Sequence, residues 1–172
     1  LTLRGEAKAR IDQALEYLVA HVYGDLDLID TNYESDRDIT EILSEGIQPD
    51  MQGRLPNSAA ADKVAEYLDM QYYRNMPTSM GDIQNRYQGI PYGWREIDIA
   101  AVIAMLIRDQ RVTVKYAGQV IKPDHKELVN YLRKKTEIGK TKIEKRRTVE
   151  AANLREVRAF LREFLDVMYV PE

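Results

Sequence analysis

The chain has 172 residues, 44% of them apolar and 31% charged, which suffices for one hydrophobic core or two small ones. It has no cysteine, which excludes disulfides, thiol catalysis and thiolate metal sites. It has no apolar run long enough to cross a bilayer and no signal peptide, so we expect a cytoplasmic protein. Because it starts with Leu1 rather than Met, we expect a piece of a longer protein.

The net charge of −3 is unevenly distributed along the chain. Residues 25–50 hold nine acidic residues against one basic residue, Arg37. Residues 133–147 hold eight basic residues against two acidic ones, Glu137 and Glu144. This asymmetry indicates either a nucleic-acid face and a separate acidic face for a partner, or two solvated surfaces that attract each other.

The first third of the chain predicts three helices. Apolar residues from Ile11 to Val22 at helical spacing predict a helix over residues 6–23. Ser35 and Asp38 form a capping-box pattern that starts a short helix ending at Gly46. After a loop over residues 47–57, Asn57 or Ser58 caps a helix over residues 59–75.

The middle of the chain predicts a helix, a turn, a helix and a hairpin. A second capping box at Ser79 starts a helix of about two turns, and the turn at Pro91–Trp94 follows it. The next helix, from about Gly93 to Asp109, is so apolar that it must be buried on nearly every side. Two short β-type runs around Ala117–Gly118 then predict a hairpin over residues 112–121.

The last third predicts a helix that Asp124 caps, a weak strand over residues 140–147 and a final amphipathic helix from Thr148. The fold class is therefore mainly α with a small β-hairpin or sheet and a winged-helix-like centre flanked by helices. We predict a helical N-terminal segment (1–76), a winged-helix-like domain (77–147) and a C-terminal helix packing on it (148–172).

A Gly-Lys-Thr sequence at residues 139–141 matches the end of a phosphate-binding P-loop. The full motif needs a glycine five positions before Gly139, where this chain has Lys134, and a buried strand ahead of it. We therefore do not expect a nucleotide site, and no other catalytic motif occurs in the sequence.

The two histidines and the acidic cluster at residues 25–30 do not form a recognisable metal site either. His21 and His125 are far apart in sequence, whereas a metal site usually needs clustered ligands. Asp25, Asp27 and Asp30 lack the glycine and the terminal glutamate of a calcium loop, so a solvated loop is the better interpretation.

The basic run is the best candidate for a contact surface, since phosphate binding needs many flexible cations on one face. Lys115 and Lys122 of the hairpin could extend that face. The candidate residues, for nucleic acid or an acidic partner, are Lys115, Lys122, Lys134, Lys135, Lys140, Lys142, Lys145, Arg146 and Arg147. No aromatic residue lies within residues 133–147, which disfavours a stacking platform for single strands.

The apolar helix and the aromatic residues are the two other features that bear on binding to nucleic acid or a partner. The helix at Ile97–Ile107 is too apolar to read bases, and only a few polar residues, Asp98 among them, could be exposed there. The tyrosines near Tyr72 and the group Tyr87, Tyr92 and Trp94 are expected to pack in the core or between domains rather than form a binding surface.

Several features of the sequence together carry a family resemblance. They are the Pro91–Trp94 turn with its apolar helix, the hairpin at Gly118-Gln119, and the stretch from Glu127 to Lys135, which a basic strand and a last helix follow. Over residues 77–168 the chain resembles the non-catalytic carboxy-terminal part of the large P-loop ATPases of bacteriophage-exclusion (BREX) systems. The resemblance implies a fragment of a multidomain phage-defence ATPase whose nucleotide site lies elsewhere, with no catalytic residue and no cofactor in this chain.

The favoured function is a non-catalytic accessory or assembly module that docks protein subunits of a larger assembly or holds DNA phosphates non-specifically, away from membranes. The alternative is a sequence-specific winged-helix DNA-binding regulator, which would need a polar recognition helix. A third hypothesis, an independent hydrolase or nuclease using Asp25, Asp27 and Asp30, lacks any diagnostic spacing.

Overall fold

A computed structural model describes residues 6–49, 51, 53–146 and 160 of the chain. Six α-helices, one 3₁₀-helix and a three-stranded sheet make up the described part. The helices are α1 (Ala7–Val22), η1 (Leu26–Leu28), α2 (Asp36–Glu45), α3 (Ser58–Tyr73), α4 (Met80–Gln88), α5 (Glu96–Arg108) and α6 (Leu128–Arg133). The strands are β1 (Val112–Tyr116), β2 (Gln119–Ile121) and β3 (Lys142–Lys145).

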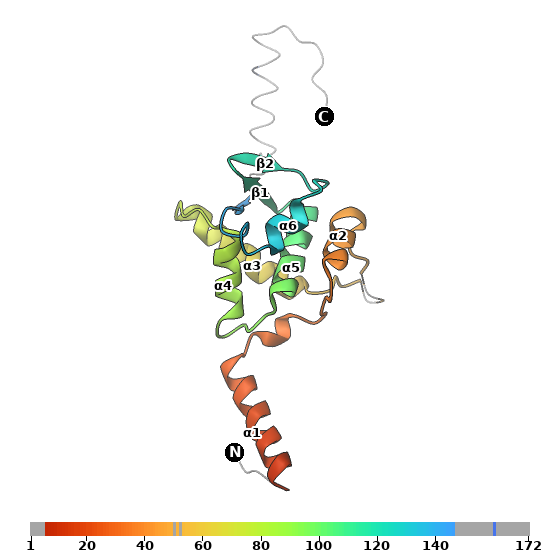
Figure 1. Cartoon of the computed structure of the whole chain (residues 1–172), viewed down its shortest axis with the longest axis vertical. Coiled ribbons are helices and arrows are strands. Elements are labelled where there is room, and N and C mark those ends of the chain that lie inside the picture. The colour runs from red at the N-terminus through yellow and green to blue at the C-terminus, as the bar shows by residue number, and fades with distance from the viewer. Residues whose placement is uncertain (1–5, 50, 52, 147–159, 161–172) are drawn as a thin grey trace.

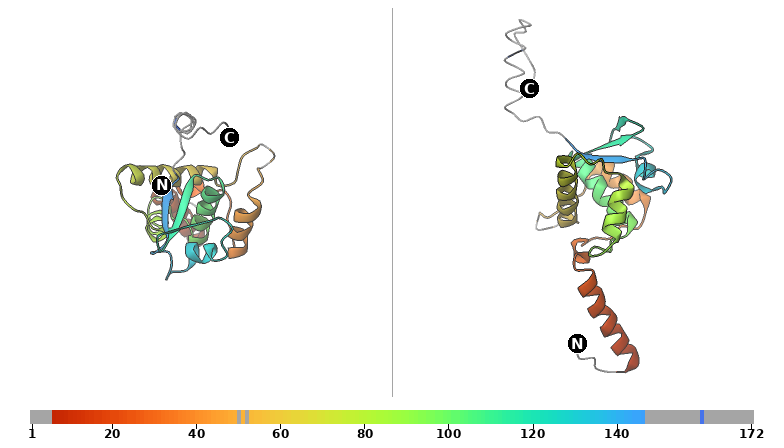
Figure 2. Two further views of the ribbon diagram at one scale, coloured as in Figure 1. Left: turned by 90° about the horizontal axis from the view of Figure 1, so that it is seen from above. Right: turned by 90° about the vertical axis from the view of Figure 1, so that its left-hand side faces the viewer.

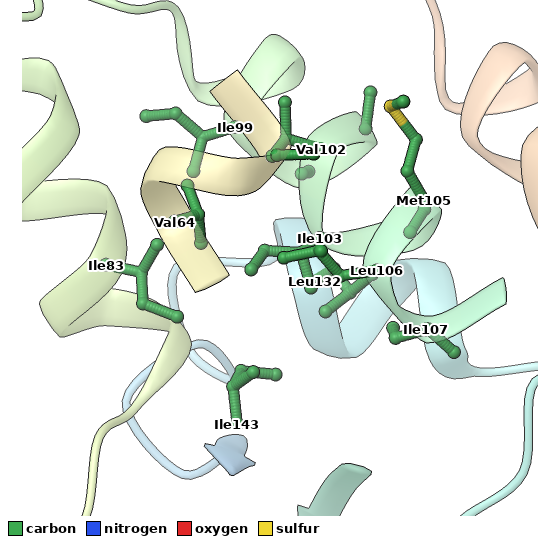
Figure 3. Close-up of a cluster of buried hydrophobic side chains, with 14 of the residues drawn as sticks. Val64, Ile83, Ile99, Val102, Ile103, Met105, Leu106, Ile107, Leu132 and Ile143 are labelled. Atoms are coloured by element: carbon green, nitrogen blue, oxygen red, sulfur yellow. The ribbon is translucent and has the colours of Figure 1, made fainter. Parts of the chain in front are cut away.

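Helix α5 lies at the centre of the body, with α2, α3, α4, α6 and β1 in contact with it (Figure 1). Every residue from Ile99 to Ile107 is buried, as the unbroken apolar sequence there predicts, and Asp98 is buried with them. Figure 3 shows Ile103 and Leu106 of this helix among side chains from α3, α4, α6 and β3. Burial on all sides explains why this helix has almost no polar residues.

The sheet has the order β2-β1-β3, with both pairs antiparallel. It lies at the end of the body opposite α1 (Figure 1). Ala117 and Gly118 both have positive φ, 48° and 81°, which suits the right-handed twist of a two-residue hairpin. The predicted hairpin is confirmed, and the order α4, turn, α5, hairpin confirms the winged-helix prediction.

Both predicted capping boxes are confirmed. Ser35 and Asp38 begin α2, and Ser79 and Asp82 begin α4. The central helix begins later than predicted, at Glu96, because the turn before it is held by its own hydrogen bonds. The Trp94 N–H donates to the Tyr87 carbonyl at 2.9 Å.

One predicted cap is wrong, and a second is confirmed in position but not in its side-chain bond. The helix expected from Asp124 begins instead at Leu128, because tight turns occupy residues 122–127, including a bond from the His125 N–H to the Lys122 carbonyl. Asn57 does occupy the N-cap position of α3, but its side chain makes no cap bond. Asn57 Oδ1 instead accepts from the backbone N–H groups of residues 30 and 31, each at 2.9 Å.

Helix α1 projects away from the body (Figure 2). None of its residues is buried, and the predicted apolar stripe is open, with Leu15 and Leu18 each more than half exposed. At its base, the Tyr23 ring packs against Gly93, the Asp25 N–H donates to the Pro91 carbonyl, and Trp94 Nε1 donates to the Asp25 carbonyl at 3.0 Å. Within the described residues, no helix is long and apolar enough to span a membrane.

Residues on both sides of the boundary predicted at residue 76 contribute to one hydrophobic cluster. Ile39 of α2 and Val64 of α3 are fully buried in it, together with Ile83 of α4. Helices α2 and α3 therefore pack on the winged-helix part. The helix predicted from Thr148 lies outside the described residues.

Candidate functional site

The outer face of the sheet gathers much of the predicted basic surface. Along β1 and β3, Val112, Val114 and Ile143 are buried against the helices, so the alternate residues point outward. Lys115 and Lys142 are directly opposite each other in the β1–β3 register. Two cations thus lie side by side on the outer face.

This face continues beyond the strands in both directions. Lys122 follows β2, and Arg146 follows β3, where its N–H donates to the Arg111 carbonyl and extends the pairing. By strand alternation, both share the side of Lys115 and Lys142. We call these four residues the cationic sheet face. The carboxylate of Glu144 shares this face, and Asp82 of α4 lies near enough to Lys142 for the lysine to help lower the pKa of that carboxyl.

A hollow of about 700 Å³ runs along this region of the sheet, with residues of all three strands in its lining. Lys115, Lys122 and Arg146 are among the lining residues, as is Val120, which is 61% exposed. Lys115 pairs with Glu144 at 2.7 Å. Within the part of the chain that the structure describes, no ion pair within 4 Å involves Lys122, Lys142 or Arg146.

Other candidates of the basic run are directed elsewhere. Lys145 has the same strand parity as the buried Ile143 and forms a 2.8 Å ion pair with Asp69 of α3, while its ammonium lies 5.3 Å from the centre of the Tyr73 ring. The hydrogen bond from Lys145 to Asp69 raises the pKa of the lysine. Lys140 pairs with Glu137 at 3.5 Å.

The remaining candidates are not brought onto the sheet. Lys134 and Lys135 are exposed in the connection after α6, and Arg147 lies outside the described residues. One member of the basic run does meet the acidic segment, since Arg133 pairs with Asp36 of α2 at 2.9 Å. Part of the charge asymmetry is therefore satisfied within the chain.

The polar residues of α5 offer little for reading bases. Asp98 is 1% exposed, which corrects the expectation that it could face solvent. It accepts a 2.7 Å hydrogen bond from Arg95 and another of 2.9 Å from the Tyr33 N–H. Its role is therefore to hold the segment before α2 against α5.

The Gly-Lys-Thr sequence belongs to a turn between α6 and β3, not to a strand–helix junction. The Thr141 hydroxyl donates to the carbonyls of Tyr131 and Glu137, each at 3.0 Å, and Thr141 is fully buried. The turn also supports α4, because the Met80 N–H donates to the Thr141 carbonyl. These bonds give the motif a structural role.

Local contacts explain His21 and, among the first acidic residues, Asp30. His21 lies near the end of α1 and hydrogen bonds to the Tyr17 carbonyl. Asp30 accepts from the Asn57 N–H and the Thr31 hydroxyl. Across the described ranges, no three His, Asp or Glu residues are grouped to hold a metal ion.

The aromatic residues divide into a core group and a surface group. Tyr87, Tyr92 and Trp94 are buried, as predicted, and Tyr87 stacks on Trp94 with ring centres 4.7 Å apart. Tyr72 and Tyr73 are exposed instead, because α3 ends there at the edge of the body.

One aromatic contact was not foreseen from the sequence. Tyr116 of β1 stacks on Tyr131 of α6 at 4.2 Å, and His125 covers the Tyr131 ring at 5.7 Å. Tyr116 also hydrogen bonds to Glu137, which raises the pKa of the tyrosine and lowers that of the carboxylate. These residues lie on separate elements, so no local pattern in the sequence marks the stack.

A family model described as the winged helix-turn-helix domain of the BREX ATP-binding protein BrxC matches residues 25–147 of the chain. The match covers more than two thirds of the sequence and begins just after α1. It includes α2 to α6 and the whole sheet. No solved structure matches the chain.

Proposed function

Because the chain belongs to the family of winged helix-turn-helix domains of the BREX ATP-binding protein BrxC, we propose that it is a non-catalytic assembly module of a phage-defence ATPase. Its function is to dock partner subunits in the cytoplasm and to hold nucleic-acid phosphates on the cationic sheet face without reading their sequence. The matched family is a winged-helix domain, which is distinct from the nucleotide-binding part of such an ATPase.

The observation that carries the proposal is the set of four cations on one outward face of the sheet, where Glu144 is the one carboxylate contributed by the described strands. The Lys115–Lys142 neighbours repel each other, so an anion placed between them relieves that repulsion. The hollow beside the strands is lined by Lys115, Lys122 and Arg146, so a phosphate chain could approach these three cations there, whereas Lys142 lies outside the hollow. Phosphate contacts of this kind give affinity that does not depend on sequence.

The burial of α5 supports non-specific binding over a sequence-specific regulator. Base reading by a helix-turn-helix protein needs polar side chains of the second helix in the major groove. In this chain the second helix is α5, and its residues 98–107 are all buried. The alternative is therefore not supported by the position of that helix.

The test is binding of the purified chain to a random-sequence DNA duplex over a series of salt concentrations. Three or four phosphate contacts predict a slope of log affinity against log salt of roughly −3 to −4. The variant Lys142→Glu with Arg146→Glu should flatten the slope by about 2, since it removes two contacts. The matched control, Lys134→Glu with Lys135→Glu, makes the same change in net charge away from the sheet and should leave most of the binding.

Two results would contradict the phosphate-binding proposal. One is the absence of binding even at low salt, which would point to an acidic protein surface as the ligand of the cationic sheet face. The other is an equal loss in the two double variants, which would show that net charge alone, rather than this face, attracts the duplex.

A further inference from the structure

A pocket of about 210 Å³ is lined by residues from the end of α3, from the connection to α4 and from β3. Its lining extends from the core to the surface, because Leu68 and Ile143 are almost fully buried whereas Met76 is 54% exposed. A cavity of about 150 Å³ holds one benzene molecule, and sites for drug-sized ligands begin at about 300 Å³. The pocket therefore has room for a single apolar side chain rather than for a cofactor.

The outer edge of β3 presents backbone groups beside this pocket. The Arg146 N–H donates to the Arg111 carbonyl on the β1 side. By alternation, the backbone groups of Ile143 and Lys145 point away from β1. The Ile143 N–H donates on that side to the Thr78 carbonyl at 2.9 Å, but this pairing does not extend to Lys145. Within the described residues, the N–H and C=O of Lys145 thus remain without a backbone partner next to the pocket that this residue lines.

Gln71, another lining residue, has a buried amide with an unused acceptor. Its Nε2 lies 2.7 Å from the Tyr67 hydroxyl and donates to it, whereas its Oε1 is buried and has no hydrogen-bond partner among the described residues. A buried acceptor without a partner costs free energy, and a donor on a bound ligand removes that cost. The pocket therefore suits a ligand that brings an N–H donor together with an apolar side chain.

We propose that this pocket and the outer edge of β3 bind an extended peptide segment of a partner protein. The segment lies antiparallel to β3, as the bridge between Ser79 and Lys142 does, and exchanges two backbone hydrogen bonds with Lys145. The peptide residue opposite Lys145 points to the same side of the sheet as Lys145, so its apolar side chain enters the pocket. This inference rests on the part of the proposed function in which the domain docks a partner subunit.

Charge complementarity specifies the neighbours of that apolar residue. Both neighbours point to the outer face, where the preceding one lies opposite Arg146 and the following one opposite Glu144. Arg146 is exposed and makes no ion pair within the part of the chain that the structure describes. Glu144 is already paired with Lys115 at 2.7 Å. The bound segment therefore has Asp or Glu immediately before its apolar residue.

Selection from a random decapeptide library displayed on phage, against the immobilised 172-residue chain, tests the class of ligand. We expect enriched sequences in which an acidic residue immediately precedes an apolar one. In a synthetic copy of an enriched peptide, N-methylation of the apolar residue should abolish binding, because its N–H donates to the Lys145 carbonyl. N-methylation of either neighbour should be tolerated, because the N–H groups of the neighbours point away from β3.

Two matched substitutions on α3 and just after it test the pocket itself. Met76→Glu places a carboxylate in the apolar lining and should raise the Kd of the enriched peptide about tenfold. Met70→Glu makes the same change at an exposed residue outside the lining and should leave the Kd unchanged. Gln71→Leu removes the acceptor and should raise the Kd about fivefold. Urea denaturation followed by Trp94 fluorescence confirms that each variant is folded.

Three outcomes would overturn the proposal. The first is a selection that enriches no peptide. The second is an equal effect of Met76→Glu and Met70→Glu on the Kd, which would place the peptide elsewhere on the domain. The third is a molar mass that rises with concentration above the 19.9 kDa of one chain and returns to it in Met76→Glu, which would assign the pocket to a second copy of the chain.

The same variant separates this site from the phosphate-binding surface. Met76 is not part of the cationic sheet face, so the salt slope of DNA binding by Met76→Glu should equal that of the unsubstituted chain. A peptide that binds to a chain with no affinity for DNA would leave the pocket in place and overturn phosphate binding alone. DNA binding without any enriched peptide would do the reverse.

Discussion

Asn57 joins the segment before α2 to the start of α3, and replacing it gives a sharp test of the fold. The residue is fully buried and has a φ of 54°, in the left-handed region. Its Oδ1 accepts from the N–H groups of Asp30 and Thr31, and its Nδ2 donates to the Thr31 carbonyl at 2.8 Å.

The expected loss for Asn57→Ala follows from these contacts. Three hydrogen bonds at a net value of about 1 kcal/mol each contribute about 3 kcal/mol. Alanine in the left-handed conformation adds about 1 kcal/mol. We therefore expect the free energy of unfolding to fall by about 4 kcal/mol, a large share of the stability of a typical domain. Asn57→Gly loses the same bonds without the backbone strain and should be less damaging by about 0.5–1 kcal/mol.

Urea denaturation followed by tryptophan fluorescence measures this loss, because the only tryptophan, Trp94, is 2% exposed in the body. A loss below about 1 kcal/mol for Asn57→Ala would refute the assigned hydrogen bonds. A glycine variant less stable than the alanine variant would refute the role of the left-handed backbone. The first result would mean that residues 30 and 31 do not depend on the Asn57 side chain for their position.

Three further predictions concern stability. The hydrogen bond from the Ser79 hydroxyl lowers the pKa of Asp82, so this carboxylate stabilises the fold above the ordinary aspartate pKa and loses that effect as pH falls through its lowered value. Asp82→Ala should lower the free energy of unfolding by about 1–2 kcal/mol at pH 7, measured by chemical denaturation. The difference in unfolding free energy from the unsubstituted chain should shrink below about pH 4, where the carboxylate is protonated. A difference that stays constant with pH would contradict a stabilising role of the charged carboxylate. Gly93→Ala should lower the melting temperature, because its φ is +65° and a Cβ would meet the Tyr23 ring at 2.7 Å; an unchanged melting temperature would mean that this ring does not pack there. Leu106→Ala leaves a cavity at a fully buried site and should lower the free energy of unfolding by about 2–5 kcal/mol, measured by denaturation. A smaller decrease would show that the side chains around α5 rearrange to fill the cavity.

The local features of the fold were predictable from the sequence because their causes are local. Ser35 with Asp38 and Ser79 with Asp82 satisfy the backbone of their own helices. Ala117–Gly118 supplies the two positive φ values of its own turn. The start of α6 was mispredicted because Asp124 has the composition of a cap, whereas turns at residues 122–127 determine where the helix begins.

The candidate site was only partly predictable, since strand register decides which cations share a face. Lys142 and Lys145 look alike in the sequence, yet one faces outward beside Lys115 and the other pairs with Asp69. That difference depends on pairing between β3 and a strand about thirty residues earlier, and the only apolar residue of β3 is Ile143. Periodicity likewise shows that α1 has an apolar face but not what covers it.

The contacts at the base of α1 make this helix a lever arm with its pivot at the turn before α5. A helix of 16 residues is about 24 Å long, so a tilt of about 10° at the pivot moves the far end by about 4 Å. Gly93 and Trp94 at the pivot are only a few residues from the start of the buried helix. A force applied to the N-terminal end of α1 would therefore be transmitted through the hydrogen-bonded contacts at residues 23–25 and 91–94 to the buried helix α5.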